Sequence, residues 1–300
     1  MTSHSTGYKL LLGNIVVLTF FYLGSDFVLR NWGLAPEQMM SWGWGAAMVV
    51  MTPFFLFRSK TRTTLRGEWK KYWKFLVIIS FVTVGAGLLF LYGIDKAGSG
   101  PVALLENMQP IFALLLGMMF LSERLNRGEI FSALLIFGGI SLISALKGEV
   151  TPDAVFALVG SSFLYALHSF LFKQFGKEAN TVCFVFLRGW LSAVLLWLLI
   201  LMVGKVEWVG WEVLFILALI NVLGMGVARY FFFQAHKHLP ISKLNIFLLL
   251  QPVGVLLGTF LIFGDPVSFQ KILGAILILS GGFFFARSKK EKNLNLQKIK

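Results

Sequence analysis

The sequence predicts an all-α polytopic membrane protein with ten transmembrane helices, arranged as two inverted five-helix repeats. Three observations carry this prediction. The composition is 57% hydrophobic and only 14% charged. The apolar runs are too long and too numerous for one soluble core. A polar segment around Gln109-Pro110 returns in the second half of the chain as Gln251-Pro252.

The expected helices are joined by mostly short connections, which leave no room for a soluble domain. We expect residues 1–149 to form the first repeat, residues 150–286 the second, and residues 287–300 a basic cytoplasmic tail. The helices are expected at Leu10–Arg30, Glu37–Phe57, Phe75–Tyr92, Pro101–Leu121, Ile130–Leu146, Asp153–Phe175, Val182–Val203, Trp211–Ala235, Leu244–Phe263 and Lys271–Ala286.

One polar interruption stands out among the apolar runs, in the segment from Leu104 to Glu123. Glu106 and, one turn later, Gln109 precede Pro110 in a helix otherwise suited to hydrocarbon. Pro110 lacks a backbone N–H and its ring clashes with the Glu106 carbonyl, so the helix is predicted to bend there. A broken helix with polar side chains inside a bilayer is a candidate functional site.

The same pattern recurs in the second half of the chain. Gln251-Pro252 follows the first Gln-Pro pair at an offset that also aligns Asp265 with Glu123. Pro252 therefore predicts a second bend, and the recurrence predicts a repeat of half the chain length. Five helices per half is an odd number, so the second half must enter the membrane from the opposite side.

Positive charges lie mostly on one side of the predicted topology. With the N-terminus in the cytoplasm, 20 of the 27 Lys and Arg residues fall in cytoplasmic segments and five in outer segments. Cytoplasmic loops carry an excess of Lys and Arg, so we predict a multi-pass protein of the inner (cytoplasmic) membrane with both termini cytoplasmic. This bias accounts for the net charge of +13, and no nucleic-acid partner is expected. The basic segment 58–74 is expected to face anionic lipid.

Several chemistries are disfavoured by the residue pattern. Cys183 is the only cysteine, so no intrachain disulfide and no cysteine-based metal centre can form. Neither an HExxH nor a GxSxG motif is present. We therefore expect no metal, no cofactor and no enzymatic activity.

The ten-helix pattern resembles the EamA family of the drug/metabolite transporter superfamily. The resemblance is carried by Gln109-Pro110 through Ser122-Glu123-Arg124-Leu125 and, more weakly, by Gln251-Pro252 through Gly264-Asp265. It implies secondary transport of a small metabolite, most often export in bacteria, with a central cavity between the halves. The chain departs from the family pattern at Asp265, where Glu is commoner, and at Trp42, where many relatives have Arg.

Two acidic residues are candidates for coupling transport to protons. Glu106 is expected in the outer third of its helix, and Asp26 near the outer end of the first helix. A carboxylate in a low-dielectric setting can load and release a proton near neutral pH. The alternatives are that Glu106 caps backbone groups at the helix break, and that Asp26 extends to the outer interface.

Amides and cations are the candidates for binding substrate. Gln109 and Gln251 offer donors and acceptors to a polar substrate, or they bond neighbouring helices. Arg188 and Arg229 lie near the cytoplasmic ends of adjacent helices. They form either a cationic vestibule that attracts carboxylates or contacts with inner-leaflet phosphates. The vestibule favours anionic or zwitterionic cargo over cationic cargo.

Four more polar side chains complete the candidate set. Tyr165 and His168 share one helix face, where the histidine could relay protons or bond within a helix interface. Tyr22 lies near the stripe of Asp26 on the first helix, and Asn221 lies in the eighth helix.

The predicted function is secondary active transport. We expect an exporter of a small metabolite such as an amino acid or a related carboxylate or zwitterion, working by proton antiport and alternating access. The alternatives are an uptake carrier, a channel or receptor, and an integral membrane enzyme. A channel would require a repeated ring of charges or carbonyls, and none is visible. The fifth and tenth helices are expected to form a peripheral scaffold or the face of a homodimer.

Overall fold

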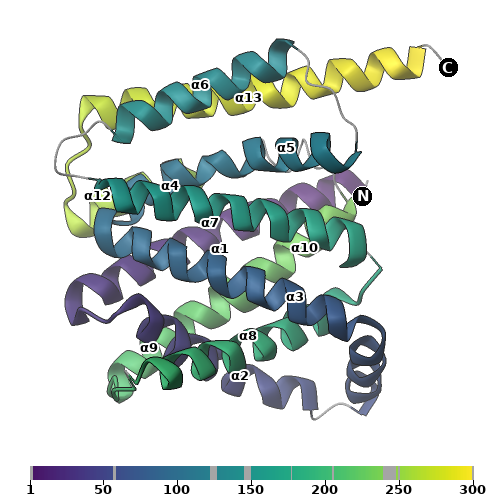
Figure 1. Ribbon diagram of the computed structural model, residues 1–300, viewed down its shortest axis with the longest axis vertical. Helices are drawn as coiled ribbons and strands as arrows, with labels where there is room; N and C mark the ends of the chain where they lie inside the picture. Colours follow the sequence, from purple (N-terminus) through teal and green to yellow (C-terminus); the bar gives the residue numbers. More distant parts are fainter. Residues whose placement is uncertain are drawn as a thin grey trace.

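The computed structural model describes residues 3–56, 59–121, 127–144, 150–176, 178–204, 206–238, 248 and 251–298. These residues are helical almost throughout, and none of them forms a β-strand, which confirms the all-α prediction. The helices run side by side across the view of Figure 1. α1 begins and α13 ends at the same end of the bundle.

The first half of the chain contains one helix that is broken at a proline and one that is longer than expected. Its elements are α1 (Ser3–Trp32), α2 (Pro36–Leu56), α3 (Ser59–Ala97), α4 (Ser99–Leu105), η1 (Glu106–Met108), α5 (Gln109–Leu121) and α6 (Arg127–Ser144). α3 begins at Ser59 rather than Phe75, because the basic segment 59–74 continues the helix beyond the apolar run.

The second half contains two helices with π-helical segments that periodicity does not predict. Its elements are α7 (Pro152–Leu171), η2 (Phe172–Gly176), α8 (Thr181–Val203), α9 (Trp211–Asn221), η3 (Val222–Ala228), α10 (Arg229–His238), α12 (Gln251–Phe263) and α13 (Phe269–Lys298). Residues 244–247, where the ninth helix was expected to begin, lie outside the described residues. So do residues 122–126, with Glu123, and residues 145–149 before the predicted repeat boundary.

The predicted break at Pro110 coincides with a change of helix type. Residues Glu106–Met108 form a 3₁₀ turn between α4 and α5. Pro110 cannot donate to the Glu106 carbonyl, and the backbone N–H of Gln109 donates to it instead. The break therefore lies immediately before the proline, at the three residues that include Glu106.

The two halves pack against each other along their whole length. α3 lies against α7 and α8, α2 against α8 and α9, α1 against α10 and α12, and α6 against α13. At the last contact, a Cβ on Gly281 would lie 2.8 Å from the Ser132 carbonyl oxygen, so glycine permits the close approach. Figure 1 places α6 and α13 at one edge of the bundle, the peripheral position expected for the fifth and tenth helices.

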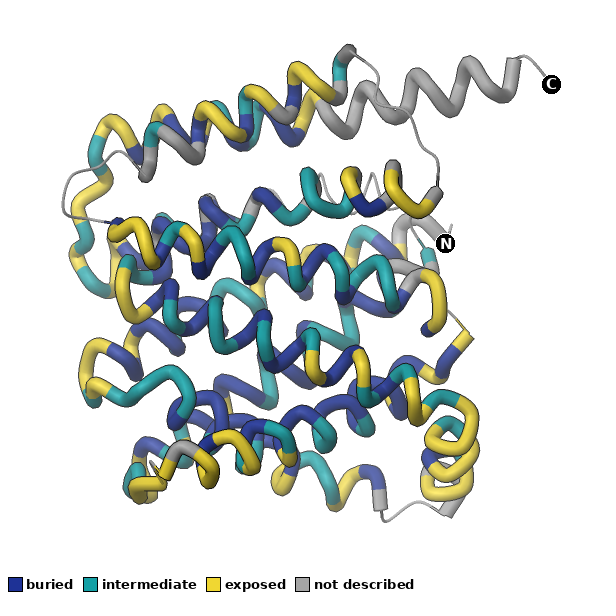
Figure 2. The backbone as a smooth tube through the Cα atoms, in the orientation of Figure 1, coloured by how far each residue is buried: buried dark blue, intermediate teal, exposed yellow. Residues whose placement is uncertain are grey.

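Five of the described helical segments are individually long and apolar enough to cross a membrane. They are Thr6–Trp32, Arg62–Ala97, Pro152–Gly176, Thr181–Met202 and Trp211–Ala235. Shorter apolar stretches lie in α6, α12 and α13. Figure 2 shows buried backbone concentrated in the central helices, while exposed positions lie on the outward turns.

Candidate functional site

A partly buried carboxylate joins three helices at the break before Pro110. The Tyr22 hydroxyl of α1 donates to Glu106 Oε2 at 2.9 Å. The Ser161 hydroxyl of α7 lies 2.8 Å from Glu106 Oε1 and 3.0 Å from the Ala86 carbonyl oxygen in α3. Among the described residues, the partners of the Glu106 carboxylate are hydroxyls from other helices, which contradicts the alternative that it caps backbone groups at the break.

The geometry around Ser161 accommodates both protonation states of Glu106. A serine hydroxyl has one hydrogen and can accept with its oxygen. If Ser161 donates to Glu106 Oε1, its hydrogen bond stabilises the ionised carboxylate. If Ser161 donates to the Ala86 carbonyl, its oxygen can accept a hydrogen bond from a protonated Glu106. The Ser161 hydroxyl can therefore hydrogen-bond to Glu106 whether its carboxyl group is protonated or ionised.

Arg188 brings a cation into the centre of the bundle. Its side chain is completely buried, and Nη1 lies 3.4 Å from Thr83 Oγ1 and 3.3 Å from His168 Nε2. Its guanidinium also lies 6.0 Å from the centre of the Phe233 ring. A side chain enclosed by α3, α7 and α10 does not extend to lipid headgroups, so of the two alternatives the phosphate contact is wrong for Arg188.

Arg229 supplies a second cation on the same side of α7. It follows the π-helical segment η3, and its guanidinium lies 5.0 Å from the centre of the Tyr165 ring. Tyr165 and His168 are one turn apart on α7, so this helix presents the Tyr165 ring face to Arg229 and the His168 ring nitrogen Nε2 to Arg188. A π-helical segment adds a residue to the turn and often occurs at functional sites.

The two arginines have more donors than the protein occupies. Within the described part of the chain, Arg188 Nε, Arg188 Nη2 and Arg229 Nε are buried without a hydrogen-bond partner. Burying a guanidinium with unused donors is costly, because each lost water hydrogen bond is left uncompensated. An anionic group between these side chains would satisfy them.

The two glutamines lie at corresponding starts of helices but have different surroundings. Gln109 Nε2 lies 3.4 Å from Ser169 Oγ, which itself donates to the Tyr165 carbonyl. Gln251 begins α12 and is half-buried, and Pro252 beside it is buried. The structure therefore brings Gln109 to α7 beside the cluster.

Asn221 lines a small cavity but bonds to its own helix. Its Nδ2 donates to the Leu217 carbonyl at 2.9 Å. Together with Tyr165, Met40, Trp44 and other residues it lines a cavity of about 10 Å³, which holds about one water molecule. This cavity therefore leaves no room for a substrate beside Asn221 and Tyr165.

Asp26 does not extend to the membrane interface, as one alternative expected. Its side chain is buried, and it accepts hydrogen bonds from Arg30 of its own helix and from Ser99 at the start of α4. It belongs to a separate charged group at the end of the bundle.

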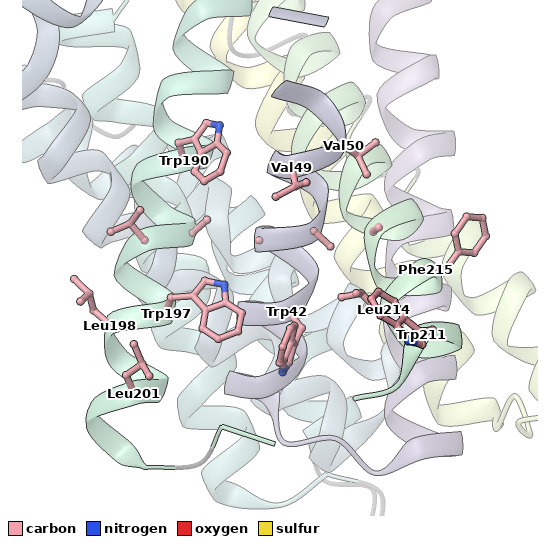
Figure 3. Close-up of a pocket in the computed structure, with 15 residues that line it drawn as sticks. Trp42, Val49, Val50, Trp190, Trp197, Leu198, Leu201, Trp211, Leu214 and Phe215 are labelled. Carbon is pink, nitrogen blue, oxygen red and sulfur yellow. The ribbon is translucent and has the colours of Figure 1, made fainter. Parts of the chain in front are cut away.

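A large cavity lies away from this polar cluster. It is an open groove of about 670 Å³ between α2, α8 and α9, and Figure 3 shows Trp42, Trp190 and Trp197 along it. Its lining is apolar, so it offers no partner for a charged substrate. Trp42 Nε1 donates to the Glu207 carbonyl at 3.0 Å, so this residue joins α2 to the segment before α9.

Sequence reasoning missed Ser161, Thr83, Arg30 and Ser99. Ser161 carried a usable signal, because it lies one turn before Tyr165 on the same face of an apolar helix. Thr83 is likewise a hydroxyl in the apolar part of α3. Arg30 had a local signal in Asp26, four residues earlier on the same helix, but its second partner, Asp265, is far away in the sequence.

Comparisons with known proteins agree with this architecture. The chain is 22% identical to an uncharacterized transporter of Methanothermobacter thermautotrophicus over 67% of this chain and 60% of that protein. It is 21% identical to a WAT1-related protein of Arabidopsis thaliana over 94% of this chain and 90% of that protein.

One solved crystal structure matches this chain with a TM-score of 0.67 at 17% sequence identity. The match covers 94% of this chain and 96% of the other, which shows a shared fold. The model of the EamA-like transporter family matches residues 5–145 and again residues 153–287. This double match confirms the polytopic architecture with two repeats, and the chain belongs to the EamA-like transporter family.

Proposed function

We propose that this membrane transporter exports a small zwitterionic metabolite, such as an amino acid, in exchange for protons. The observation that carries the proposal is the pair of arginines beside the Glu106 cluster. Arg188 is fully buried, and three N–H-bearing atoms of the pair have no partner among the described residues. A carboxylate is the planar anion that a guanidinium binds best.

Charge balance supports a single carboxylate. With Glu106 ionised and His168 neutral, the cluster of Glu106, Arg188 and Arg229 carries one net positive charge. One substrate carboxylate neutralises it. Buried charges are tolerated when they are paired, so the arginines favour a substrate that carries a carboxylate. A zwitterion pairs its carboxylate with the arginines and its ammonium with Glu106, and the complex keeps one positive charge.

Whether proton coupling gives symport or antiport depends on which groups the substrate carries besides its carboxylate. Protonating Glu106 makes the cluster more positive, which strengthens the binding of a simple carboxylate and favours symport. A substrate ammonium group that binds at Glu106 reverses the sign, because the added proton removes its partner. Proton-driven export therefore requires a zwitterion, with its carboxylate toward the arginines and its ammonium toward Glu106.

Alternating access determines the direction in which the substrate is transported. A proton that reaches Glu106 from outside releases the substrate there, and loss of the proton to the cytoplasm prepares the site for the next substrate. Export then follows from an inward proton gradient. Exchange of one proton for one zwitterion moves one net charge, whereas symport of a proton with a carboxylate moves none.

The test is transport by the purified protein in liposomes. For each of several side chains, the competing compounds are the amino acid, the carboxylic acid without its amine and the amine without its carboxylate. We expect the amino acid alone to exchange across the membrane, and a potassium–valinomycin potential to change the rate of proton-driven flux. Equal transport of the amine-free acid, or flux indifferent to the potential, would contradict zwitterion antiport.

A further inference from the structure

A charged group joins three helices at the end of the bundle opposite the start of α1. Arg30 Nε lies 2.7 Å from Asp26 Oδ1, and Arg30 Nη2 lies 3.2 Å from Asp26 Oδ2. The same guanidinium binds Asp265, with Nη1 2.9 Å from Oδ1 and Nη2 2.6 Å from Oδ2. Asp265 follows α12, so Arg30 connects the first repeat to the second.

The start of α4 joins the same group. Ser99 donates both its backbone N–H, at 2.9 Å, and its hydroxyl, at 2.7 Å, to Asp26 Oδ2. The residue before it, Gly98, has a φ of +74°, and a Cβ there would lie 3.1 Å from Arg30 Nη2. We call Asp26, Arg30, Ser99 and Asp265 the latch.

The latch holds together the ends of helices that lie next to the polar cluster. Tyr22 lies one turn before Asp26 on α1, and Glu106 follows directly on α4. α12 packs on α1 through Gly254, whose Cβ would lie 3.0 Å from Thr19 Oγ1. A passage from Glu106 to this end of the bundle thus requires α1, α4 and α12 to separate.

The two halves of the latch differ in exposure. The Asp26 side chain is 2% exposed, whereas those of Arg30 and Asp265 are 37% and 30% exposed. Water can hydrate Arg30 and Asp265 when they part, but Asp26 would be left as a buried charge. Separation is therefore easiest between Arg30 and Asp265, while Arg30 and Ser99 remain with Asp26.

The geometry points to the latch as a gate that must open at the Arg30–Asp265 contact when the transporter opens to this side. In that step α12 moves away from α1 and α4, which remain joined through Asp26. Asp265 is a positioning residue in this scheme and binds no substrate. The inference requires alternating access but is independent of which substrate is carried.

The experiment measures how easily the interior behind the latch is reached. Val102 lies on α4, three residues beyond Ser99, and is fully buried. In a Cys183→Ser background, Val102→Cys is labelled with a membrane-impermeant methanethiosulfonate, applied in turn to each side of the membrane. Asp265→Asn should increase the labelling rate from the latch side about two- to fivefold, the effect of losing a partly exposed ion pair.

A matched control uses another carboxylate at the same end of the bundle. Asp153 on α7 accepts a hydrogen bond from Tyr92 on α3, and neither residue belongs to the latch. Asp153→Asn should leave the labelling rate unchanged. An unchanged rate in Asp265→Asn, or an equal increase in both variants, would overturn the gate.

Hydrogen exchange gives a second measurement without the cysteine. In the otherwise unaltered chain, Asp265→Asn should increase the amide exchange of residues 99–105 by a similar factor, whereas Asp153→Asn should not. Unchanged exchange of residues 99–105 in the Asp265→Asn variant would contradict the proposal even if the Val102→Cys variant fails to fold.

Discussion

Tyr22 donates its phenolic hydrogen to Glu106 across 84 residues of sequence, with Oη 2.9 Å from Oε2. This contact joins α1 to the 3₁₀ turn η1. Ser161 of α7 binds the other carboxylate oxygen of Glu106, so α7 is joined to the same group. A single carboxyl group therefore links helices of both repeats. Any movement of one repeat against the other must break or remake these bonds.

The first prediction concerns proton coupling through Glu106. Glu106→Gln keeps the size and most hydrogen bonding of the side chain but removes its titration. We expect it to abolish uphill transport driven by a pH gradient while allowing substrate exchange at equal concentrations on both sides. Both fluxes are measured in proteoliposomes between pH 6 and 8.

The exposed Glu212 at the start of α9 offers the control. Glu212→Gln should transport like the unaltered protein. If Glu106→Gln still concentrates substrate as well as that protein across the pH range, Glu106 is not the coupling group. Asp26 is bound into the latch, so His168 would then be the next candidate.

The second prediction concerns the break before Pro110. Pro110→Ala restores a donor for the Glu106 carbonyl and favours a continuous α-helix through η1, which would turn Glu106 away from Tyr22 and Ser161. Pro252→Ala is the corresponding substitution in the second repeat, at the bend that the sequence predicts there. Both variants should fold in membranes and transport slowly, as measured by initial rates normalised to membrane protein.

α2 contains a third proline inside a helix, Pro53, which lies on an exposed turn away from the cluster. Pro53→Ala removes a helix-interior proline without affecting the site and should leave the rate unchanged. Unaltered rates in Pro110→Ala and Pro252→Ala would show that transport does not require these bends.

The third prediction concerns topology, which rests on the distribution of Lys and Arg. In the Cys183→Ser background, Thr151→Cys should react with an impermeant thiol reagent from outside the cell, and Thr63→Cys should react from the cytoplasm. Both positions are exposed in the structure, so reagent access depends only on the side of the membrane. The opposite pattern would place both termini outside.

Ser99, which also belongs to an outer segment of the predicted topology, is unsuitable for this labelling experiment. Its side chain is buried against Asp26. A cysteine at that position would report the opening of the latch rather than the side of the membrane.

The fold was predictable because long apolar runs and repeated Gln-Pro pairs are local features of the sequence. The polar residues of the site were predictable for a similar reason, since Glu106 and Arg188 are conspicuous in hydrocarbon-like segments. Their pairing was not predictable, because which helix faces Glu106 depends on packing between distant segments. The place of Ser161 one turn before Tyr165 marked it as a candidate but did not identify Glu106 as its partner.

The wrong alternatives for Arg188 and Asp26 have the same cause, since the surroundings of each side chain depend on packing between distant segments. The depth of Arg188 along its helix suggested access to lipid phosphates, but burial depends on the neighbouring helices that enclose it. Asp26 near a helix end suggested an interfacial group, but Arg30 and Ser99 enclose it. The π-helical segment before Arg229 shifts the register of that helix, and no residue pattern announced it.

The last prediction compares two arginines that differ in pairing. Arg188 has no acidic partner within hydrogen-bonding distance among the described residues, whereas Arg30 binds two carboxylates. Replacing an unpaired buried charge with an apolar side chain removes a desolvation penalty, so Arg188→Met should leave the melting temperature unchanged or raised. Arg30→Met leaves Asp26 buried without its cation and should destabilise the protein by about 3–5 kcal/mol.

For substrate affinity we expect the opposite order, with Arg188→Met more damaging than Arg30→Met. Arg188→Met removes charge-assisted hydrogen bonds to a carboxylate, each worth about 1.5–3 kcal/mol, so substrate affinity should fall at least about tenfold. Arg30→Met should leave the affinity of the folded fraction near its original value, because Arg30 belongs to the latch. Melting curves in detergent and substrate-binding isotherms on the same preparations measure both effects. A lower melting temperature with unchanged affinity in Arg188→Met would assign that arginine to the scaffold instead of the substrate site.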